Sequence, residues 1–262
     1  MDFENIIYTV EDGIATIKLN RPKALNALNS AINQDIMAAI NLVKADPSVR
    51  VLIMTGSERA FAAGADVKEM AEAVGGFAFG GGCEMTLACD FRVGGSRTTL
   101  SFPEVGLGII PGANGCARAT AIVGPAKAKQ LVMLTEMIPG KQAYDLGLLN
   151  WFAVGDADLD AAAKAAKAAV KAAKASGNEE ELAAAKAALK SAEGAAAKAE
   201  YDAIMAKAVD VAKKLMGKPA CALASAKAAI NKAAIETIAA GKAQETTEFT
   251  LLFDTHDQKE GM

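Results

Sequence analysis

The first part of the chain alternates between segments with strand periodicity and segments with helical periodicity. Apolar and polar residues alternate over 6–10 and 13–19, and Asp12-Gly13 between them is typical of a hairpin turn. Apolar residues then recur at helical spacing over 29–44, before a β-branched run over 49–55 that is typical of a buried strand. This succession predicts an α/β fold.

Beyond residue 60 the predicted elements are shorter, and glycine is more frequent. It predicts a loop over 61–64, short strands over 91–93 and 98–102, and helices over 81–89, 124–135, 140–146, 220–238 and about 243–253. We expect the methionines of this region to fill the core. They are Met70, Met85, Met133 and Met137.

Composition changes sharply past residue 155. Between residues 161 and 200, 20 of 40 residues are alanine, and most of the others are Lys or Glu. Gly177 suits a left-handed helix end and Asn178 suits the N-cap of the next helix, so the segment predicts a helical hairpin. Its few large apolar residues predict a thin packing seam, which favours a solvated spacer, with a binding surface as the alternative.

Charge and cysteine content narrow the classes of function. The net charge of −3 and the absence of a basic stripe argue against nucleic-acid binding, and no apolar run is long enough for a membrane span. The four cysteines form no C-x-x-C pair, which fits a reducing, cytoplasmic location. The single histidine, His256, has no spaced partners, so no metal site is expected.

Three glycines, at residues 80–82, directly precede Cys83 and Glu84. They match neither the dinucleotide nor the P-loop pattern. Glycines that open a helix allow a ligand to approach the backbone, and they leave N–H groups free to stabilise an oxyanion. Glu84 then lies about one turn into the helix, beside the bound group. The alternative is a tight helix–strand crossing with a solvated Glu84.

A second carboxylate, Glu104, stands among apolar residues after Pro103. Partial desolvation there would favour its protonated form and suit proton transfer. Taken alone, however, Glu104 is more simply interpreted as an exposed loop acid. Together, Glu84 and Glu104 suggest an acid/base pair that holds and activates one water.

Several segments resemble the crotonase superfamily, specifically its enoyl-CoA hydratases. They are "NRPKALNAL" (20–28), "FAAGADVKEM" (61–70), "GFAFGGGCE" (76–84), "PEVGLGIIPGA" (103–113) and the terminal "DQKEGM". The resemblance implies an α/β fold: a crotonase-like spiral of ββα units with a helical C-terminal region, here with an inserted helical hairpin. It also implies acyl-CoA thioester substrates, with coenzyme A as part of the substrate and no separate cofactor.

The resemblance assigns roles to particular residues. The oxyanion-hole donors correspond to the backbone N–H groups of Ala65 and Gly81, and the catalytic acids to Glu84 and Glu104. In the implied hydration reaction, water lies between the acids and Glu104 handles the proton exchanged at the α-carbon. The positions that contact substrate correspond to Ala24, Leu25, Asp66, Val67 and Lys68.

The sequence also departs from the family pattern. The helix and buried strand that the family has after the segment ending at Met70 are absent, and the Ala/Lys-rich hairpin has no family counterpart. We therefore expect a shortened core over 1–155, an insertion over 156–208 and a helical C-terminal region over 209–262. The departures suggest an engineered or computationally generated chain.

Three hypotheses of function follow. The first is an enoyl-CoA hydratase that forms a homotrimer or a dimer of trimers. The second is an engineered structural scaffold with little or no activity. The third is another crotonase reaction, such as enoyl-CoA isomerisation or acyl-CoA hydrolysis.

Overall fold

The computed structural model describes residues 3–63 and 76–235, with the isolated positions 247 and 251. The strands of these residues are β1 (Ile6–Glu11), β2 (Ile14–Leu19), β3 (Val51–Thr55), β4 (Ala60–Ala62), β5 (Phe77–Phe79), β6 (Val93–Gly94), β7 (Thr99–Ser101), β8 (Ile138–Pro139) and β9 (Trp151–Phe152). The α-helices are α1 (Ser30–Ala45), α2 (Gly81–Ala88), α3 (Gly115–Met133), α4 (Gly140–Asp145), α5 (Ala157–Ser176), α6 (Glu179–Met216) and α7 (Ala220–Ile235). Two 3-10 turns are η1 (Pro22–Ala24) and η2 (Glu104–Leu107).

The first sheet has the order β1-β2-β3, and helices cover both of its faces. β1 and β2 form the predicted hairpin, with Asp12 and Gly13 at positive φ, and β3 runs parallel to β2. Alternate residues of β2 point to opposite faces. Ile17 and Leu19 pack with α1, whereas Ile14 packs with α6. The N-cap of α1 is Asn29, whose side chain accepts a hydrogen bond from the amide of Ile32 at 3.0 Å.

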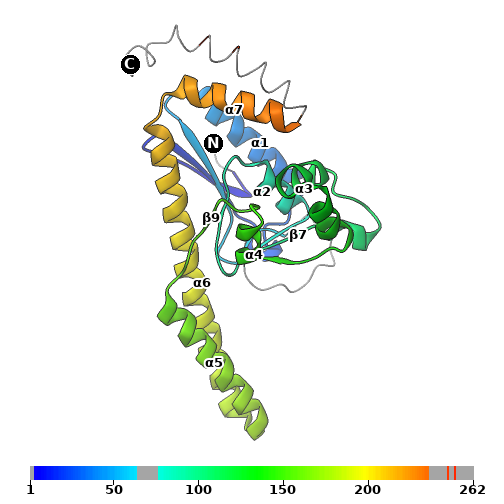
Figure 1. Cartoon of the computed structure of the whole chain (residues 1–262). Helices are drawn as coiled ribbons and strands as arrows, with labels where there is room; N and C mark the ends of the chain where they lie inside the picture. Colours follow the sequence, from blue (N-terminus) through cyan, green and yellow to red (C-terminus); the bar gives the residue numbers. More distant parts are fainter. Residues whose placement is uncertain (1–2, 64–75, 236–246, 248–250, 252–262) are drawn as a thin grey trace.

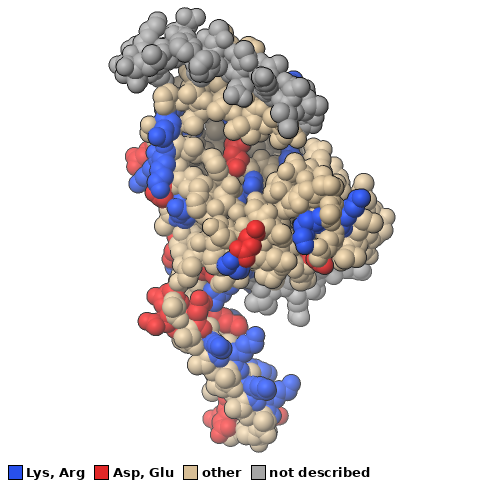
Figure 2. Space-filling view, viewed as in Figure 1, with Lys and Arg blue, Asp and Glu red and all other residues tan. Residues whose placement is uncertain are grey.

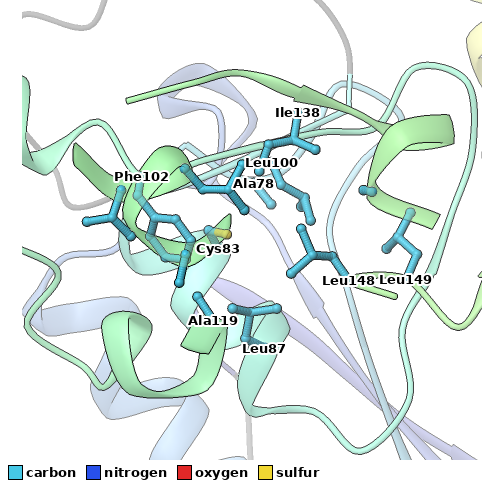
Figure 3. Packing of buried hydrophobic residues seen from close by; sticks show 13 residues of the cluster. Ala78, Cys83, Leu87, Leu100, Phe102, Ala119, Ile138, Leu148 and Leu149 are labelled. Atoms are coloured by element: carbon cyan, nitrogen blue, oxygen red, sulfur yellow. The ribbon is translucent and has the colours of Figure 1, made fainter. Parts of the chain in front are cut away.

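The second sheet has the order β4-β5-β7-β8, with the first three strands parallel. β8 closes this sheet antiparallel to β7, while β6 and β9 form a separate parallel pair. Helices α2, α3 and α4 pack on the second sheet around a core that includes Cys83, Leu100 and Phe102 (Figure 3). The predicted α/β class is confirmed.

The Ala-rich segment forms the predicted hairpin, which extends away from the body of the molecule (Figure 1). Gly177 lies between its helices at φ 73°, and the Asn178 side chain accepts hydrogen bonds from the amides of Glu180 and Glu181. Side chains of both charge signs cover the hairpin (Figure 2). α6 continues without a break from the hairpin onto the first sheet, so the boundary expected at residue 208 falls inside one helix.

The hairpin is attached to the body through Glu200 of α6, a residue that is 2% exposed. Its carboxylate accepts hydrogen bonds from the amides of Ser96 at 3.0 Å and Arg97 at 2.8 Å. Arg97 in turn forms a salt bridge of 2.7 Å with Asp160 of α5. These bonds fix the turn between β6 and β7 to both hairpin helices.

Several expectations were wrong in detail. Residues 60–62 form strand β4 where a loop was expected over 61–64, because β5 provides a pairing partner. Helix α3 begins at Gly115, nine residues before the expected start, and is kinked at Gly124-Pro125. Met133 and Met137 do not fill the core, since they are 63% and 66% exposed.

Candidate active site

The parallel strands β5 and β7 bring the two candidate acids to one edge of the second sheet. Phe79 and Ser101, the last residues of the two strands, lie side by side in the register. The segment after β5 enters α2 and carries Glu84, while the segment after β7 enters η2 and carries Glu104. The carboxyl ends of parallel strands are where open α/β sheets bind their ligands.

The glycine cluster makes a sharp turn and a close contact. Gly80 has φ 49° and ψ −122°, and its amide donates to the Ser101 carbonyl at 3.0 Å, which joins the strand ends. A Cβ on Gly82 would lie only 2.2 Å from the Ala62 carbonyl oxygen, so α2 approaches β4 more closely than any side chain allows. Gly81 begins α2, where N–H groups have no partner inside the helix.

Glu84 is buried, with a side chain 5% exposed, so the alternative of a solvated acid is wrong. Its Oε1 atom accepts hydrogen bonds from the amide of Ala113 at 2.7 Å and from the amide of Gly115 at 2.8 Å. Two amide donors on one oxygen stabilise negative charge there and fix the direction of the carboxylate. Glu84 is therefore held as a base would be.

Glu104 is also buried, at 8% exposed, which rules out the alternative of an exposed loop acid. Its Oε2 atom is inaccessible to solvent and has no hydrogen-bond partner among the described residues. Burial raises the pKa of Glu104, and the negative charge of Glu84 raises it further, while a hydrogen bond from its own backbone amide acts in the opposite direction. Glu104 therefore keeps its proton to a higher pH than an ordinary glutamate does.

Cys83 directly precedes Glu84 in α2 but is not suited to be a nucleophile. Its side chain is 1% exposed and packs in the core with Phe102 and Leu100 (Figure 3). Burial raises the pKa of the Cys83 thiol far above its usual range, and the charges of Glu104 and Glu84 add to the effect. Because the thiolate is the reactive form, this cysteine is a packing residue.

The structure brings the predicted substrate contacts Ala24 and Leu25 to the end of β4. The Leu25 carbonyl accepts a hydrogen bond of 3.1 Å from the amide of Ala63, the residue after β4. Buried Asn26 donates from its side chain to the Ala60 carbonyl at 3.0 Å. The turn that contains Ala24 and Leu25 is thus fixed to β4, which ends at the same edge as β5.

Other predicted residues lie outside the part of the chain that the structure describes. They are Ala65, Asp66, Val67, Lys68 and Met70, together with His256 and all of the helix expected over about 243–253 except positions 247 and 251. The last described residue before this group is Ala63, next to Leu25.

Sequence reasoning missed the groups that hold Glu84. The amides of Ala113 and Gly115 belong to the loop before α3, whose N-cap residue Asn114 has φ 70°. A Cβ on Gly115 would lie 2.8 Å from both Cγ and Oε1 of Glu84, so glycine is required there. The run Pro-Gly-Ala-Asn-Gly before a helix was the available signal for this loop. Because every non-proline residue has a backbone amide, the sequence does not indicate which amides donate to Glu84.

With this geometry in view, comparison with known proteins identifies the family. A family model described as enoyl-CoA hydratase/isomerase matches residues 9–73 and 72–202. The chain belongs to the enoyl-CoA hydratase/isomerase family. The two matched segments overlap at residues 72–73, close to the point after Met70 where we expected the family's helix and strand to be absent.

Individual members of the enoyl-CoA hydratase/isomerase family align over different lengths of the chain. A crotonyl-CoA hydratase of Syntrophomonas wolfei is 32% identical over 292 residues, which span 100% of this chain and 95% of that protein. A short-chain-enoyl-CoA hydratase of Clostridium acetobutylicum is 37% identical over 180 residues, which span 57% of this chain and 69% of that protein.

Solved structures agree with this assignment. The enoyl-CoA hydratase subunit I of Geobacillus kaustophilus superposes with a TM-score of 0.77 at 29% identity, covering 100% of this chain and 95% of that chain. The crotonase fold is therefore confirmed. Among the described residues, no helix combines the length and apolar character that a membrane crossing requires.

Proposed function

We propose that this protein is an enoyl-CoA hydratase, which adds water across the 2,3 double bond of an enoyl-CoA or catalyses the reverse dehydration. The observation that carries the proposal is the unequal environment of two buried glutamates at one sheet edge. Glu84 receives two amide hydrogen bonds on Oε1, whereas burial raises the pKa of Glu104 and its Oε2 has no partner among the described residues. Carboxyl groups whose environments differ in this way are suited to opposite roles.

The two environments suggest how the proton moves in hydration. The Glu84 carboxylate accepts a proton from water as the water oxygen bonds to the β-carbon. The electrons of the double bond shift toward the thioester, which becomes an enolate. Protonated Glu104 then donates its proton to the α-carbon, so one water is added in total. A proton passed from Glu84 to Glu104 restores the starting state.

The enolate oxygen requires hydrogen-bond donors placed in advance. The amide of Gly81 is at the N-terminus of α2, three residues before Glu84, and the helix dipole adds positive potential there. We assign the second donor to Ala65, and the substrate contacts to Ala24, Leu25, Asp66, Val67 and Lys68. Coenzyme A is part of the substrate, and no separate cofactor is proposed.

The assembly we propose is a homotrimer or a dimer of trimers. An apolar patch, defined as Leu107, Ile109, Ile110, Met133, Leu134 and Met137, has side chains between 52% and 70% exposed. The two parts of the patch adjoin, since a Cβ on Gly106 would lie 3.8 Å from Cγ2 of Thr135. Exposed apolar surface of this kind favours burial against another subunit.

A reducing compartment such as the cytoplasm fits the thiols. All four cysteines are free, and two of them, Cys116 and Cys221, are exposed. Exposed free thiols persist in compartments where thiols are kept reduced.

The test is incubation of the purified chain with crotonyl-CoA. A hydratase removes the absorbance of the conjugated thioester and yields a product heavier by one water. A hydrolase instead releases the free thiol of coenzyme A, and an isomerase moves the double bond of a 3-enoyl-CoA without a mass change. A folded chain that does none of these would favour the alternative of a structural scaffold.

A further inference from the structure

The loop that holds Glu84 is itself held by a charged side chain of α3. The guanidinium of Arg118 donates from Nη1 to the carbonyl oxygen of Ala113 at 2.8 Å. Ala113 is the residue whose amide donates to Glu84 at 2.7 Å. Ala113 thus accepts a hydrogen bond from Arg118 at its carbonyl oxygen and donates one to Glu84 from its amide.

This loop has few other restraints. Residues 112–114 are exposed, and Asn114 adopts a left-handed conformation without a capping hydrogen bond from its side chain. The backbone amide of Arg118 donates to the Asn114 carbonyl at 2.9 Å, so the same residue contacts the loop twice. A small rotation of the Ala113 peptide would move its N–H away from Oε1 of Glu84.

The position of Arg118 is unfavourable for helix stability alone. It is the fourth residue of α3, where the positive end of the helix dipole repels a cation. No salt bridge with a carboxylate is formed by Arg118 within the described residues. The hydrogen bond to Ala113 is therefore its main polar side-chain contact.

From this geometry we propose that Arg118 is a positioning residue, which acts through Ala113 to fix the carboxylate of Glu84 in its reactive direction. The proposal rests on the proposed hydratase function. It predicts that loss of the guanidinium impairs the chemical step rather than substrate binding, because the groups assigned to bind the substrate lie on other segments.

The matched control is Arg50, which likewise donates from its guanidinium to a backbone carbonyl, that of Lys218 at 3.2 Å, in an exposed setting. We expect Arg118→Ala to lower kcat on the order of tenfold to a hundredfold with KM changed less than about twofold. Arg118→Lys should recover part of kcat, and added guanidinium ion should partly rescue Arg118→Ala. Arg50→Ala should change neither constant and should show no rescue.

A second measurement does not depend on activity. Amide hydrogen exchange at Ala113 and Gly115 should accelerate in Arg118→Ala and stay unchanged in Arg50→Ala. Unchanged exchange, or a rise in KM with kcat intact, would overturn the proposal. If the unaltered chain lacks hydratase activity while exchange responds as expected, the proposed function fails but the positioning of the loop by Arg118 stands.

Discussion

The amide of Gly115 donates a hydrogen bond to Oε1 of Glu84 over 2.8 Å, although 31 residues separate the two along the chain. This bond joins the N-terminus of α3 to the middle of α2 and leaves no space for a side chain at residue 115. A Cβ there would also lie 2.9 Å from the ring of Phe102, so the core side of residue 115 has no space for a side chain either.

We therefore expect Gly115→Ala to displace Glu84 and to lower kcat at least about a hundredfold. Overpacking should also reduce the free energy of unfolding by about 1–3 kcal/mol. Steady-state kinetics and urea unfolding check the two effects. The matched control is Gly112→Ala, because a Cβ at Gly112 would meet no atom of the described part of the chain within 4 Å. Equal activity of the two variants would disprove the proposed steric limit.

The glycines that begin α2 should differ in their tolerance of alanine. A Cβ on Gly82 would lie 2.2 Å from the Ala62 carbonyl oxygen, whereas among the described residues a Cβ on Gly81 would meet only Cδ1 of Leu28, at 3.4 Å. Gly82→Ala should destabilise the fold by about 2 kcal/mol or more, and Gly81→Ala by less than about 1 kcal/mol. Gly81→Ala keeps the N–H donor and should retain measurable activity. Thermal unfolding of both variants in parallel measures the contrast.

The raised pKa of Glu104 predicts how stability depends on pH. The folded protein keeps this proton to a higher pH than the unfolded chain does, so the free energy of unfolding falls as pH rises through the interval between the two pKa values. The variant Glu104→Gln cannot ionise at this position, so the free energy of unfolding of this variant does not fall for this reason. Its stability relative to the unaltered chain should therefore increase as the pH rises above the ordinary glutamate pKa of about 4.

Urea unfolding at several pH values measures this trend. The exposed Glu11 provides the control, since Glu11→Gln makes the same chemical change at the surface. A stability difference between Glu104→Gln and the unaltered chain that is constant with pH would show that Glu104 titrates normally.

The apolar patch predicts self-association. Light scattering after size-exclusion chromatography should show a trimer or a multiple of it, and Ile110→Lys together with Leu134→Lys should yield monomers. These side chains are 70% and 65% exposed in the single chain, so lysine there should leave its fold intact. As a control, Val154→Lys alters an equally exposed apolar residue outside the patch. A monomeric unaltered chain would contradict the prediction.

Local signals predicted much of the fold. Asp12-Gly13 and Gly177-Asn178 end or begin elements through their own backbone and side-chain chemistry, and each does so in the structure. β8 and β9, at two residues each, were not predicted. Their pairing partners, Leu100 for Ile138 and Val93 for Trp151, lie about 40–60 residues earlier in the chain, beyond the reach of periodicity.

The candidate site, like the fold, was predicted from the sequence only in part. Family motifs pointed to Glu84 and Glu104, and their burial is confirmed, while their catalytic roles stay predictions. The amides of Ala113 and Gly115 and the guanidinium of Arg118 became evident only from the structure. Their contribution depends on the path of the loop, which tertiary packing determines rather than residue type.

The central claim is that Glu84 and Glu104 act together on one water, and the most direct test is the rate of crotonyl-CoA hydration by Glu84→Gln and by Glu104→Gln. Glu11→Gln serves as the control, and calorimetry measures the affinity of each variant for a saturated acyl-CoA. Both site variants should lose activity on the order of a thousandfold while they bind acyl-CoA normally. Activity within about tenfold of the unaltered chain in either one would contradict the two-acid mechanism.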